Sequence, residues 1–130
     1  MDGYAIKLAD LETFTTFNIA GKSFAGNPFE GKTQAGECVR IMTGAMIPAG
    51  CDAVIMQEET EQAGENQIKF TNSIKLGQNI RRVGEDVAQG SLVLTKGSLL
   101  NVASLPLLAS LGIAKVEVFK RTKVAILSTG

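Results

Sequence analysis

At residues 38–57 the chain reads CVRIMTGAMIPAGCDAVIMQ, two short apolar runs separated by a loop. The runs are Cys38–Met42 and Ala53–Gln57, and apolar runs of this length fit buried strands. The loop Thr43–Gly50 is punctuated by two glycines and a proline, which favour turns. This stretch therefore predicts two buried strands joined by a loop.

Further strand candidates extend outward from this centre. The whole chain has 14 glycines, and short segments between glycines are typical of a β-rich fold with many turns. Gln67–Phe70 alternates between polar and apolar residues, as a half-buried strand does. The other expected strands are Tyr4–Leu8, Phe14–Ile19, Leu92–Leu94 and Val116–Phe119.

A single segment is strongly helical in pattern. Asn101 is a suitable N-cap and Gly112 a suitable stop, which predicts a helix near residues 102–111. Pro106 favours a later start near Ser104, because proline is tolerated in the first helical turn. Val102, Leu105, Leu108 and Ala109 fall on one face of this helix.

The last segment, residues 123–130, has the pattern of a buried strand ending in Ser-Thr-Gly. Such a strand often opens an α/β unit, so we expect the chain to be truncated there. The expected fold class is mainly β (α+β): an irregular β-rich domain of short strands, plus a small segment with one helix, truncated at the start of an α/β domain.

Composition excludes several function classes. The 130 residues fit one domain or two small ones, and the net charge of zero argues against general nucleic-acid binding. The chain has no histidine, which excludes Ser-His-Asp catalysis and histidine-ligated metals. Its two cysteines, Cys38 and Cys51, are too few for a zinc site. Nothing resembles a secretion signal or a membrane span, so we expect a cytoplasmic protein with reduced thiols.

Residues 26–33, Gly-Asn-Pro-Phe-Glu-Gly-Lys-Thr, match the phosphate-binding pattern GxxxxGK[ST]. That chemistry requires a buried strand before the loop and a helix after it. The sequence predicts neither, because residues 21–24 are not a hydrophobic strand and Gly36 interrupts the segment that follows. We therefore expect a surface loop between strands.

Four segments together resemble the MoeA/gephyrin family of molybdopterin molybdenumtransferases. They agree with the family in order and spacing along essentially the whole chain. The segments are Met1-Asp2-Gly3-Tyr4-Ala5; Val39–Ala45 continuing through Thr60; Gly77-Gln78-Asn79-Ile80-Arg81-Arg82 with Gly84-Glu85-Asp86; and Leu108–Gly112 with Val124–Gly130.

The resemblance implies an architecture. Residues 1–86 resemble the family's β-rich second domain, residues 87–122 part of its elongated first domain, and residues 123–130 the opening strand of its third domain. On this basis a helical N-terminal segment and most of the third domain, with its acidic pair and main ligand surface, are absent from the chain.

The resemblance also implies a reaction. The family inserts molybdate into adenylylated molybdopterin and releases AMP, with Mg2+. It works as a homodimer whose active site lies between the third domain of one subunit and the second domain of the other. A molybdopterin adenylyltransferase is a further implied partner. We expect the fragment alone to be inactive, and the alternative function is a non-catalytic dimerisation or scaffolding module.

The resemblance selects Asp2, Thr43 and Asp86 as catalytic residues and Arg81 and Gly44 as substrate-binding residues. Asp2 is also the expected metal ligand, directly or through water. A hydroxyl and a glycine amide after a strand suit an oxyanion, and a guanidinium suits phosphate or molybdate.

Simpler structural roles remain open for the same residues. Asp2 with Gly3 can form a turn, Thr43 can belong to an ordinary strand exit, and Arg81 can pair internally with a carboxylate. The choice between Arg81 and Arg82 is also open. For the run Glu58, Glu59 and Glu61 we expect a solvated strand edge, and for Met42, Met46 and Met56 core or gap filling.

Overall fold

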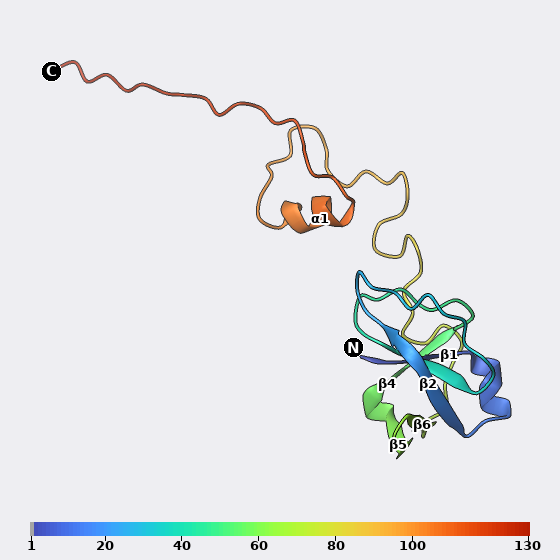
Figure 1. The fold of residues 1–130 in the computed structure, drawn as a ribbon. Coiled ribbons are helices and arrows are strands. Elements are labelled where there is room, and N and C mark those ends of the chain that lie inside the picture. Colours follow the sequence, from blue (N-terminus) through green and yellow to red (C-terminus); the bar gives the residue numbers. More distant parts are fainter. Residues whose placement is uncertain (1) are drawn as a thin grey trace. The chain divides into compact units, whose positions relative to one another are not determined.

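The structure, a computed structural model, describes residues 2–130. The chain divides into two compact units, Met1–Asp86 and Val87–Gly130. The first unit holds the sheet and the second holds the α-helix (Figure 1). The prediction of a mainly β fold with one helix is confirmed for the described residues.

One six-stranded sheet forms the first unit, in the order β4-β1-β3-β2-β6-β5. All neighbouring strands are antiparallel except β2 and β3, which are parallel. The strands are β1 Gly3–Ile6, β2 Thr16–Ser23, β3 Glu37–Ile41, β4 Ala53–Met56, β5 Thr60–Gly64 and β6 Gln67–Phe70. Two 3-10 helices, η1 Leu8–Glu12 and η2 Gln57–Glu59, follow β1 and β4.

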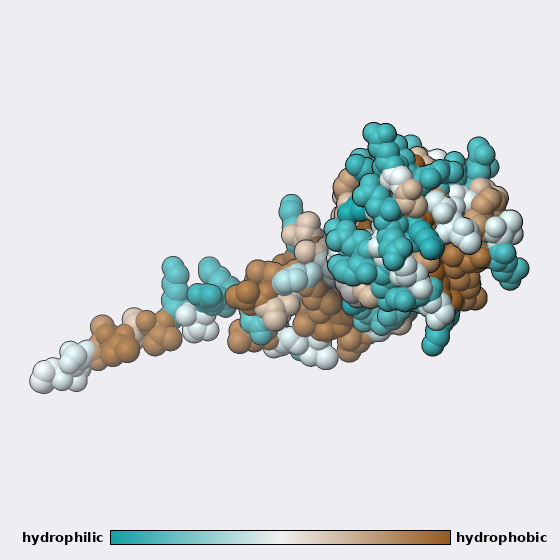
Figure 2. Space-filling view, turned by 90° about the horizontal axis from the view of Figure 1, so that it is seen from below, coloured by the Kyte–Doolittle hydropathy of each residue, from teal (hydrophilic) through white to brown (hydrophobic). Residues whose placement is uncertain are grey.

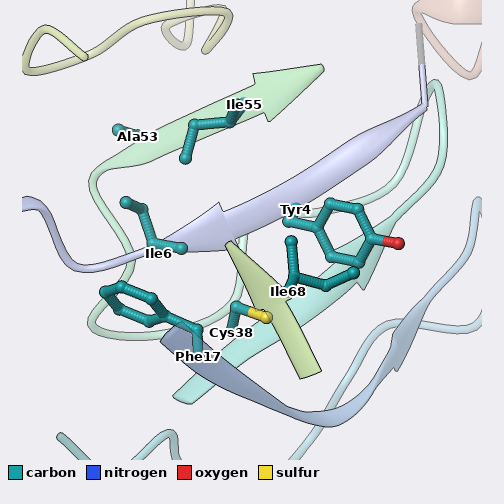
Figure 3. Close-up of a cluster of buried hydrophobic side chains, with 7 residues drawn as sticks. All are labelled: Tyr4, Ile6, Phe17, Cys38, Ala53, Ile55 and Ile68. Atoms are coloured by element: carbon teal, nitrogen blue, oxygen red, sulfur yellow. The ribbon is translucent and has the colours of Figure 1, made fainter. Parts of the chain in front are cut away.

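Strand β1, between β4 and β3, is buried along its whole length because apolar side chains cover both faces of the sheet. Tyr4 and Ile6 belong to a seven-residue cluster on one face, together with Phe17 and Cys38 (Figure 3). Ala5 points to the other face and packs with Ile41 and Val54. Strands that are buried on both faces read as continuous apolar runs, which explains the pattern from which β3 and β4 were predicted.

Several strand predictions are confirmed. β6 has the predicted bounds, and β1, β2, β3 and β4 each overlap a predicted segment. Leu8 was expected to end the first strand but instead begins η1. β5 was missed because its sequence, Thr-Glu-Gln-Ala-Gly, has no apolar alternation and its residues are almost all exposed. It pairs with β6 alone, so Glu61 does lie on a solvated strand edge.

The predicted strands after residue 86 are wrong. Leu92–Leu94, Val116–Phe119 and residues 123–130 form no strand in the described chain. Val124, Ile126 and Leu127 are largely exposed, and Figure 2 shows apolar side chains along the extended segment. A strand needs a partner for its backbone groups, and residues 87–130 supply none. Met46, expected in the core, is also exposed, at 71%.

The second unit contains α1, Ser104–Ser110, so the later helix start is confirmed and Pro106 lies in the first turn. The Asn101 side-chain oxygen accepts the amides of Ala103 and Ser104 at 3.0 and 3.2 Å. Gly112, with φ +72°, ends the helix in a conformation that glycine adopts without strain. Leu108 is buried, whereas Val102 precedes the helix and is exposed. No described helix has the length and apolar character needed to span a bilayer.

Residues 26–33 form an irregular loop, as predicted, and the next element after them is the strand β3, not a helix. One part of that argument is wrong: β2 continues to Ser23, so a strand does precede the loop. The residues looked too polar for a strand because only alternate side chains of this part of β2 are buried. Without a helix N-terminus, the loop lacks the feature that binds phosphate in such motifs.

Candidate functional site

The fold brings Asp2 and Thr43 together although they are 41 residues apart. Gly3 pairs with Ile41, so the start of β1 lies beside the end of β3. The Thr43 amide donates a hydrogen bond to Asp2 Oδ1 at 3.2 Å. The alternative for Asp2, a carboxylate bonded to its own turn, is not the contact formed. Two predicted site residues therefore meet at one end of the sheet.

The Thr43 turn is shaped by local and long-range contacts. The Ala45 amide donates to the Met42 carbonyl at 3.0 Å, which closes the turn. Gly44 has φ +81°, a conformation in which other residues are strained, and it is exposed. Thr43 and Gly44 are both exposed residues of the first unit.

Ser23, which the sequence did not single out, connects this turn to the rest of the unit. It is fully buried. Its hydroxyl donates to the Met46 carbonyl at 3.0 Å and accepts the Phe29 amide at 3.3 Å, while its carbonyl accepts the Met42 amide at 3.1 Å. Ser23 thus holds both ends of the Thr43 turn, and no local sequence pattern indicates this.

Arg81 and Asp86 form the one ion pair found within residues 2–130. Arg81 Nη1 lies 2.7 Å from Asp86 Oδ1 and 2.8 Å from Oδ2. The two side chains are 74% and 71% exposed, and exposed pairs contribute little to stability. The internal Arg–carboxylate pair considered as a simpler role is therefore present. Whether Arg81 or Arg82 serves a site stays a prediction.

The segment before Arg81 is anchored to the free edge of β4. The Val54 amide donates to the Gln78 carbonyl at 3.0 Å, and Asn79 Nδ2 donates to the Val54 carbonyl at 2.9 Å. Ile80 packs against the cluster that contains Ala5. These contacts fix the point at which the Arg81–Asp86 loop leaves the sheet.

A second polar constellation was also missed by the sequence argument. Arg40 Nη1 donates to the Tyr4 hydroxyl at 2.7 Å, and Nη2 donates to Gln57 Oε1 at 2.8 Å. The Gln57 amide in turn donates to the Asp2 carbonyl at 3.1 Å. Tyr4, Arg40 and Gln57 line a pocket of about 600 Å³ on the sheet. Arg40 is a charged residue inside the apolar run Cys38–Met42, and this was the sequence signal that could have indicated the polar constellation.

No group of three or more Cys, Asp or Glu residues among residues 2–130 could hold a metal ion. Asp2 offers one carboxylate, one oxygen of which already accepts the Thr43 amide. A magnesium site built entirely from carboxylates of residues 2–130 therefore does not fit. Mg2+ is often held by one or two carboxylates plus substrate phosphates, so the metal role of Asp2 stays a prediction.

The cysteines are both free thiols. Burial raises the pKa of the Cys38 thiol to about 12, with smaller contributions from Cys51 and Glu37. Burial also raises the pKa of Cys51, against the opposing effect of its hydrogen bond with Thr33. Thiols held in the protonated form are poor nucleophiles, so neither cysteine fits a nucleophilic role.

Known proteins resemble this chain along nearly its whole length. Residues 1–112 match the family model described as MoeA N-terminal region (domain I and II). A molybdopterin molybdenumtransferase of Haemophilus influenzae is 55% identical over 130 residues, covering 100% of this chain and 32% of the relative. A gephyrin of Dictyostelium discoideum is 40% identical over 144 residues, covering 99% of this chain and 20% of the relative.

A solved structure agrees with these sequences. The molybdopterin biosynthesis moeA protein of Pyrococcus horikoshii OT3 has a TM-score of 0.77 at 35% identity, covering 89% of this chain and 32% of that one. The chain thus spans about a third of the length of the molybdenumtransferases that it matches. Because the family model covers most of its residues, the chain belongs to the MoeA family, in the family's N-terminal region.

Proposed function

We propose that this chain is part of a molybdopterin molybdenumtransferase, which inserts molybdate into adenylylated molybdopterin and releases AMP. The supporting observation is the 55% identity to the Haemophilus influenzae enzyme over the whole chain. The geometry adds to it, because two of the residues selected by the resemblance, Asp2 and Thr43, are in contact.

The proposed assembly follows the family. Met1–Asp86 corresponds to its second domain, residues 87–122 to part of the first, and residues 123–130 to the start of the third. In a homodimer in the cytoplasm, this chain supplies one wall of a cleft that the third domain of the partner subunit completes. Thr43 and Gly44 then face the oxyanion, Arg81 binds phosphate or molybdate, and Asp86 orients Arg81 through their ion pair.

Within this proposal Asp2 acts through its charge. Mg2+ bound by substrate phosphates would neutralise their charge, and Asp2 would ligate the ion or one of its waters. The Thr43 amide holds one carboxylate oxygen, which fixes the orientation of the side chain toward the end of the sheet.

The test is an exchange of the matching segment of the Haemophilus influenzae enzyme for this chain, followed by Asp2→Asn and Thr43→Ala. Asn keeps an oxygen that can accept the Thr43 amide and removes only the charge. Turnover should fall by roughly a hundredfold, the cost of losing one placed electrostatic contact in a transition state. The free energy of unfolding should change by about 0.5 kcal/mol, as for other surface substitutions.

Asp10→Asn is the matched control. Asp10 Oδ2 also accepts a backbone amide at 3.2 Å, that of Gly36, but Asp10 belongs to η1 and has no proposed role. It should leave turnover unchanged. If activity falls only in step with melting temperature, or equally in Asp10→Asn, then Asp2 and Thr43 are structural residues. Partial recovery of Asp2→Asn by added Mg2+ would support the metal role.

A scaffolding function is the second candidate, and the 40% identity to a gephyrin favours it. The two functions differ in one measurement. A transferase segment restores turnover in the exchanged enzyme, whereas a module suited only to assembly restores the oligomer without turnover. The chain by itself should form no cofactor and should be a monomer or weak dimer by light scattering.

A further inference from the structure

Three side chains form a row across neighbouring strands. Tyr4 of β1 pairs with Arg40 of β3, and Arg40 pairs with Lys22 of β2. Side chains of directly paired residues lie on the same face of a sheet, and like charges placed opposite each other are destabilising. Arg40 and Lys22 therefore put two positive charges side by side on one face.

Neither Arg40 nor Lys22 forms a salt bridge in the described chain. The Arg81–Asp86 pair is the one salt bridge among residues 2–130, so no carboxylate oxygen of those residues lies within 4.0 Å of Arg40 or Lys22. Arg40 instead donates to two neutral oxygens, and its guanidinium carbon lies 5.4 Å from the Tyr4 ring centroid. These contacts orient the guanidinium, and neither Arg40 nor Lys22 forms a salt bridge within residues 2–130.

The row lines the pocket of about 600 Å³, with β5, β6 and η2 forming its other sides. Figure 3 shows the Tyr4 ring among the buried side chains with its hydroxyl directed away from them. Thr60, Gln62 and Asn66 add neutral hydrogen-bonding groups to the lining, and Ile19 and Ile68 add apolar surface. Two exposed carboxylates, Glu58 and Glu65, also line it.

We propose that this pocket binds a small molecule through a phosphate monoester group, with Arg40 and Lys22 as the charged donors. A guanidinium presents several N–H groups in a plane that suits phosphate oxygens, and only two of its contacts are satisfied within the chain. A dianion matches the two positive charges of Arg40 and Lys22, neither of which is ion-paired with Glu58 or Glu65 of the same lining. The volume is typical of small-molecule pockets and exceeds what a bare phosphate fills, so the ligand carries an organic part.

Tyr4 is a positioning residue in this site. Its hydroxyl accepts from Arg40 Nη1 and its ring lies against the guanidinium, so it holds the donor in place. Gln57 connects the pocket to Asp2, because its side chain accepts from Arg40 while its amide bonds to the Asp2 carbonyl. The inference nevertheless stands on the charges and the pocket and does not require the proposed function.

The test is an NMR titration of the 15N-labelled chain with phenyl phosphate, and with benzyl alcohol as the uncharged comparison. Phenyl phosphate should shift the amides of Lys22, Arg40 and Thr60 with millimolar affinity that weakens as salt is raised, and benzyl alcohol should not. Lys22→Gln, at an exposed site, should weaken binding about fivefold, and Arg40→Gln about tenfold or more, since each removes a charged donor.

Lys69→Gln is the matched control, because Lys69 is an exposed lysine of β6 outside the pocket lining. It should leave the affinity unchanged. The proposal is overturned if phenyl phosphate shifts no amide at the pocket, if the shifts centre on Arg81 and Arg82, or if Lys22→Gln binds as well as Lys69→Gln. If inorganic phosphate binds as tightly as phenyl phosphate, the inference that the ligand carries an organic part is wrong. None of these outcomes depends on turnover. The titration therefore tests the pocket even if the proposed transferase function is wrong.

Discussion

Gly3→Ala tests how closely strands β1 and β4 are packed. Gly3 begins β1 and pairs with Ile41 on one side and Met56 on the other. A Cβ at this position would overlap the Ile55 carbonyl oxygen and lie 2.9 Å from its carbon and 3.3 Å from Met56 Cα. All three atoms are backbone of β4, so no side-chain rotation can relieve the overlap.

The expected loss of stability is large for a single methyl group. Overpacking a well-packed site costs about 1–3 kcal/mol, and more where the backbone itself must shift. We expect a loss of about 3 kcal/mol, because β4 would have to separate from β1. In a domain of this size each kcal/mol lowers the melting temperature by about 4–8 °C, so the midpoint should fall by roughly 12–24 °C.

Thermal unfolding of the chain, followed by far-ultraviolet circular dichroism, measures this change. Tyr4 is the one tyrosine, and the chain has no tryptophan, so its fluorescence reports on β1 in the same samples. Gly64→Ala is the matched control, since a Cβ there meets only the Gln67 side chain, with Oε1 at 3.2 Å. If both variants melt at the same temperature as the parent, the inferred contact between β1 and β4 is wrong.

Three further perturbations test other parts of the structure. Ser23→Ala leaves the Met46 carbonyl and the Phe29 amide without their partner, so it should cost about 1–3 kcal/mol in urea unfolding; Ser23→Thr should recover part of the loss if the hydroxyl is responsible. Phe17→Ala removes a fully buried ring that contacts Phe70, at a centroid distance of 5.0 Å, and should cost about 3–5 kcal/mol; a smaller loss would mean that the core collapses around the gap. Burial raises the pKa of Cys38 from 9.0 to about 12, so the stability that the protonated thiol contributes should be complete below pH 9 and lost as pH rises toward 12. Over this range the urea midpoint of Cys38→Ala should therefore decline less steeply than that of the parent chain. Parallel declines in the two proteins would contradict a raised pKa for Cys38.

The sequence by itself determined the local structure of several segments. The apolar runs that became β3 and β4, the alternation of β6 and the proline-compatible start of α1 are all confirmed. Each depends on interactions within a few residues or on burial that leaves a regular pattern. The order of the motifs was also enough to predict the family, and the match of residues 1–112 to the MoeA family model confirms that prediction.

Only the tertiary structure decided which of these segments meet. The parallel pairing of β2 with β3 and the contact of Asp2 with Thr43 join residues that are distant in the chain. No local pattern specifies such pairings, because they depend on the register of strands around a shared core. For the same reason the apolar segments after residue 86 were wrongly predicted to be strands. Their sequences have the apolar pattern of strands, but no described strand pairs with them. In the sequence Arg40 and Lys22 are distant charged residues, and only the register of β2 and β3 shows that they lie side by side.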